Sequence, residues 1–63
     1  NSPGKFIQFL GIALGSLAEL ETLIMICEPL GYIPSPTAEQ LLSDCDEIQR
    51  LLAALLQSLK TKN

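Results

Sequence analysis

The chain has 63 residues, of which 48% are hydrophobic and only 5% aromatic, and its seven acidic and four basic residues give a formal net charge of −3. A chain of this length forms at most one domain, and such domains bury only about 60% of the surface of the unfolded chain. The four basic residues, Lys5, Arg50, Lys60 and Lys62, are scattered along the sequence. Because nucleic-acid affinity depends largely on neutralising phosphates, this balance argues against nucleic-acid binding by this chain alone.

Small domains usually need a disulfide, a metal ion or association with other chains to be stable. Cys27 and Cys45 are the only cysteines, and in a helical hairpin that turns near Ile33 they are offset by roughly 9 Å along the axis. That offset exceeds what a disulfide tolerates, so we expect two free thiols that pack as small hydrophobic side chains. Histidine is absent and the cysteines lack zinc-ligand spacing. No metal or cofactor is expected. Of the three ways to stabilise a small domain, association with other chains is therefore the one that remains.

The first predicted helix covers about residues 3–29. Ser2 is the expected N-cap and Pro3 the first helical residue, since proline lacks only a donor that would be unpaired there. Gly31 fits the left-handed position after the helix, with Tyr32 folding back onto the last turn as in a Schellman motif. Pro29 cannot bond to the carbonyl of Met25, so we expect the helix to end early or bend near its end.

The second predicted helix covers about residues 36–59, after a loop at about residues 31–35. We expect Ser35 to be its N-cap and Pro36 to lie in its first turn. A loop this short joins antiparallel neighbours. The sequence therefore predicts an all-α fold in which residues 1–63 form a single antiparallel helical hairpin.

Both predicted helices carry more apolar surface than one hairpin can bury. Projected at about 100° per residue, apolar side chains cover roughly 240° of the first helix and roughly 200° of the second, against the 100° or so that faces one neighbour. We therefore expect bundle and subunit contacts through a stripe on the first helix and a heptad seam on the second. The predicted interface residues are Phe6, Phe9, Leu10, Ala13, Leu17, Leu20, Glu21, Ile24, Leu41, Cys45, Ile48, Leu52, Leu55 and Leu59.

A membrane is not the expected cover for this surface. The mean hydropathy of +0.33 is high, but the longest charge-free apolar run, residues 6–18, is too short to span a bilayer. Beyond that run, Glu19, Glu21 and Glu28 place charges in the rest of the first helix. We expect a soluble, cytoplasmic protein without a membrane partner.

No residue pattern supports an enzyme, because the serines have neither a histidine base nor a suitably spaced lysine.

Glu21 and Glu28 lie within the apolar arc, the part of the first helix that apolar side chains cover. They are interpreted either as solvent-exposed rim residues or as partners in interhelical salt bridges. Gly11 and Gly15 have the small-xxx-small spacing, which indicates either close helix packing or glycines that the helix merely tolerates. Arg50 is spaced to pair with acidic residues one turn earlier on a solvated helix face.

The sequence resembles the family of bacterial four-helix-bundle proteins encoded in intervening sequences of 23S ribosomal RNA genes. The resemblance covers nearly the whole chain. It is carried by Lys5-Phe6-Ile7-Gln8-Phe9-Leu10, Ile12-Ala13, Gly15-Ser16-Leu17, Glu19-Leu20-Glu21-Thr22, Leu30-Gly31-Tyr32-Ile33 and Leu55-Leu56-Gln57-Ser58-Leu59-Lys60.

The resemblance implies a four-helix up-and-down bundle that assembles into homopentamers. Members of that family are about twice this length and carry these motifs in their C-terminal hairpin. The hairpin is therefore expected to complete a bundle by oligomerisation or with an N-terminal hairpin that is missing here. The first hypothesis is a non-enzymatic, self-associating protein. The alternative is a nucleic-acid-associated accessory factor like those relatives that serve diversity-generating retroelements.

Overall fold

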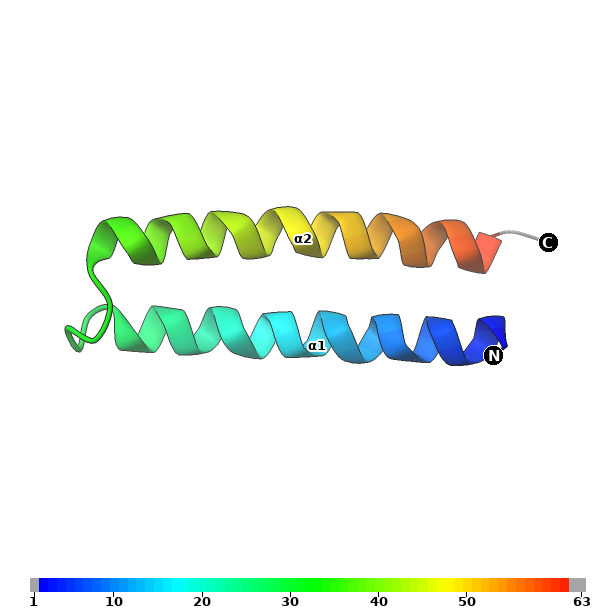
Figure 1. The fold of residues 1–63 in the computed structure, drawn as a ribbon, viewed down its shortest axis with the longest axis horizontal. Helices are drawn as coiled ribbons and strands as arrows, with labels where there is room; N and C mark the ends of the chain where they lie inside the picture. Colours follow the sequence, from blue (N-terminus) through cyan, green and yellow to red (C-terminus); the bar gives the residue numbers. More distant parts are fainter. Residues whose placement is uncertain (1, 62–63) are drawn as a thin grey trace.

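Two antiparallel α-helices make up the fold in the computed structural model, which describes residues 2–61 (Figure 1). Helix α1 spans Pro3–Cys27 and helix α2 spans Ser35–Thr61. The hairpin measures 47 × 16 × 14 Å, and its radius of gyration of 14.5 Å exceeds the roughly 10.6 Å expected for a compact domain of this length. The predicted all-α antiparallel hairpin is confirmed, and its shape is elongated.

Helix α1 begins as its sequence predicts. Ser2 has extended backbone angles, φ −90° and ψ 154°, and its Oγ accepts a hydrogen bond from the N–H of Lys5 at 3.3 Å. The Ser2 carbonyl also accepts from the N–H groups of Lys5 and Phe6. Pro3 occupies the first turn, where its missing donor costs nothing. Ser2 is therefore the N-cap of α1.

Helix α1 ends at Cys27, two residues before the expected boundary, and a Schellman motif follows it. The N–H of Tyr32 donates to the carbonyl of Cys27 and the N–H of Gly31 donates to that of Glu28, both at 3.0 Å. Gly31 has φ +86°, the left-handed conformation that this motif requires. The backbone prediction for Gly31 is confirmed. The expectation for the Tyr32 side chain is wrong, since it is 77% exposed instead of packing on the last turn.

Helix α2 begins at Ser35, one residue before the expected boundary, and extends to Thr61. The carbonyl of Pro34 accepts a hydrogen bond from the N–H of Ala38 at 2.9 Å, so Pro34 holds the capping position and the assignment of Ser35 as N-cap is wrong. The Ser35 hydroxyl instead donates to Oε2 of Glu28 at 2.6 Å. This bond joins the start of α2 to the end of α1.

The buried core of the described chain is small. Its buried side chains are Leu10, Ile24, Ala38 and Cys45. The last three form one cluster near the loop, against which Leu17, Ile33 and Leu42 pack with partial exposure. Cys27 and Cys45 are both free thiols. Such a core leaves most of the apolar side chains of both helices in contact with solvent.

The two glycines Gly31 and Gly11 should respond to alanine in opposite directions. Gly31→Ala places a Cβ at a positive φ and should lower the free energy of unfolding by about 1–2 kcal/mol. Gly11→Ala introduces a Cβ with no atom within 4 Å and should raise it by up to about 1 kcal/mol. Urea unfolding at one protein concentration measures both. Equal effects of the two substitutions would contradict the assigned turn.

Candidate interaction surface

Helix α2 faces α1 along one heptad seam. Apart from Asp46, its buried or half-buried positions follow a 4-3-4-3-4-3 spacing: Ala38, Leu42, Cys45, Gln49, Leu52, Leu56 and Leu59. The seam predicted from sequence shares only its positions 45, 52 and 59 with this one. Its other members, Leu41, Ile48 and Leu55, are exposed. Helix α2 therefore carries two overlapping seams, of which one is used within the hairpin and the other is open.

The fourteen predicted interface residues divide into three groups in the hairpin. Leu10, Ile24 and Cys45 are buried between the helices. Five are half-buried: Ala13, Leu17, Glu21, Leu52 and Leu59. Six remain exposed: Phe6, Phe9, Leu20, Leu41, Ile48 and Leu55. Sequence reasoning missed Ala38, which is 1% exposed and the most deeply buried side chain of the core. The heptad spacing from Cys45 back through Leu42 includes Ala38, but a seam through Leu41 fits the sequence equally well.

Large exposed apolar side chains recur along the outer side of each helix, interrupted in register by Ser16 on α1 and by Asp44 on α2. We call these two stripes together the apolar face; its members are Phe9, Ile12, Leu20 and Leu23 of α1 and Leu41, Ile48, Leu51 and Leu55 of α2. Every member is exposed in the hairpin, with exposed fractions between 39% and 65%.

Both stripes lie on the same side of the hairpin. At about 100° per residue, the α1 stripe is centred roughly 120° from the side of α1 that faces α2, and the α2 stripe roughly 100° from the side that faces α1. The two offsets have the same rotational sense along the chain. Because the helices are antiparallel, offsets of the same sense bring both stripes to one side of the plane through the helix axes. The apolar face is therefore one surface.

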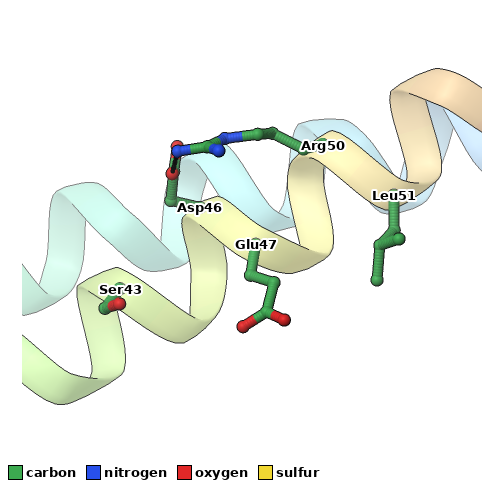
Figure 2. Close-up of a pocket in the computed structure, with 5 residues that line it drawn as sticks. All are labelled: Ser43, Asp46, Glu47, Arg50 and Leu51. Atoms are coloured by element: carbon green, nitrogen blue, oxygen red, sulfur yellow. Dashed lines mark hydrogen bonds and ion pairs between the residues drawn. The ribbon is translucent and has the colours of Figure 1, made fainter.

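On the opposite side of the hairpin, α2 is polar and carries Glu39, Asp46, Arg50 and Gln57, again at heptad spacing. Arg50 and Asp46 form a salt bridge between largely exposed side chains. In Figure 2 Arg50 reaches back along the helix to Asp46, while Leu51 projects away from this pair. We call this polar surface of α2 the solvated side.

The hollow drawn in Figure 2 has no catalytic constellation. Its lining residues all come from successive turns of α2: Ser43, Asp46, Glu47, Arg50 and Leu51. Ser43 has no activating base, and the Asp46 carboxylate is bonded to Arg50. Among residues 2–61, no group of three or more potential ligands comes close enough to hold a metal ion. The hollow lies on the outer surface of α2, between Asp46 and Arg50 of the solvated side and Leu51 of the apolar face.

The structure separates the two glutamates of the apolar arc. Glu21 is half-buried beside α2, and no salt bridge to it occurs within the described residues. Glu28 accepts the hydrogen bond from Ser35.

An alanine methyl at Gly11 or Gly15 would meet no atom within 4 Å, so the hairpin itself does not use these glycines for close packing. Any such use requires another molecule.

The hairpin exposes more surface than a compact folded monomer of the same mass. Its accessible surface is 4757 Å², whereas a folded monomer of 6.8 kDa exposes roughly 3,960 Å². The excess of about 800 Å² equals what one partner contributes to a protein interface of standard size.

Helix α1 is also long and apolar enough to cross a membrane, judged by length and composition. Its most apolar 18-residue window has a mean hydropathy of 1.8, and 11% of that window is buried in the hairpin. The charge-free run of residues 6–18 understates this property, because the window tolerates up to two charged residues. Core helices of soluble proteins meet the same criterion. The observation therefore marks apolar surface that needs cover, without deciding between protein and lipid.

Comparison with known proteins gives one match. The model of the family described as 23S rRNA-intervening sequence protein matches residues 1–54. This range includes all of α1, the loop and most of α2. No curated protein and no solved structure matches the chain.

The seam between the helices can be tested with two alanines of α2. Ala38 is buried against α1 and Ala54 is exposed. Ala38→Leu should lower the free energy of unfolding by about 1–3 kcal/mol, because added methylenes strain a packed site, whereas Ala54→Leu should change it by less than about 0.5 kcal/mol. Urea unfolding at matched concentration measures both. If the two variants were equally stable, Ala38 would not lie in the seam.

Proposed function

The chain belongs to the 23S rRNA-intervening sequence protein family, and from this premise we propose that it acts as a non-enzymatic protein that associates with copies of itself. The hairpin supplies two helices of a four-helix bundle, and association supplies the others. The molecular role is that of an assembly module. We place its action in the cytoplasm.

The apolar face is the observation that carries this proposal. Eight large apolar side chains lie exposed on one side of the hairpin. Soluble monomers rarely expose contiguous apolar patches of more than a few hundred Å², and at about 25 cal/mol per Å² covering the excess of about 800 Å² contributes a large driving force. The charged residues of the opposite side keep the assembly in solution.

An accessory role on nucleic acid receives less support. The described basic side chains are Lys5, Arg50 and Lys60, and Arg50 is engaged by Asp46. The three lysines of the sequence, Lys5, Lys60 and Lys62, are too few to neutralise the several phosphates on which nucleic-acid affinity depends. Such a role would need basic surface from another chain or from further sequence.

Association should depend on the apolar face and not on the solvated side. Ile48→Asp places a charge in the middle of the apolar face and should weaken association by about 2–3 kcal/mol, a factor of roughly 30 to 150 in the dissociation constant. Gln57→Asp makes the same carboxylate on the solvated side and should have little effect. Sedimentation equilibrium measures the mass of both variants and of the unaltered chain.

A well-packed monomer at all concentrations of the unaltered chain would refute the proposal. Equal weakening by the two aspartates would refute the assigned surface. Co-sedimentation of the protein with neutral lipid vesicles, in place of self-association, would show that lipid covers the face and would also refute the proposal.

A further inference from the structure

We draw no further inference here: the strongest candidate, the apolar face with Asp44 in register between Leu41 and Ile48, is the surface on which the proposed function already rests, and nothing in the described part of the chain shows what covers it.

Discussion

Two helices that lie side by side share a single seam, and this limit governs the whole structure. The seam between α1 and α2 buries Leu10, Ile24, Ala38 and Cys45, but both helices are apolar well beyond it. The unused surface is concentrated on one side, because the outer stripes are offset from the seam in the same rotational sense. In the proposed function, stability and association therefore depend on the same surface, the apolar face.

The parts of the fold that depend on local chemistry could be predicted from the sequence. Ser2 caps α1 and Gly31 adopts the left-handed turn because each needs only backbone groups a few residues away. The role of Ser35 could not be predicted, since its hydroxyl bonds to Glu28 of the other helix. The rotation of α2 was also beyond the sequence, because two heptad seams share Cys45 and only packing against α1 selects between them.

The chain belongs to the 23S rRNA-intervening sequence protein family. The chemistry of this chain lies in its surfaces. Exposed apolar side chains recur on one side from Phe9 to Leu23 of α1 and from Leu41 to Leu55 of α2. In the proposed function, covering these side chains supplies the driving force for association.

The concentration dependence of thermal unfolding tests the central claim most directly. If folding and association are one process, the midpoint temperature must rise with protein concentration by mass action, and the helical signal must be lost on dilution. Circular dichroism at concentrations from about 1 µM to 1 mM measures this. We expect a midpoint that rises steadily across the series. A cooperative transition with the same midpoint at every concentration would show that the hairpin is stable alone and would contradict the account.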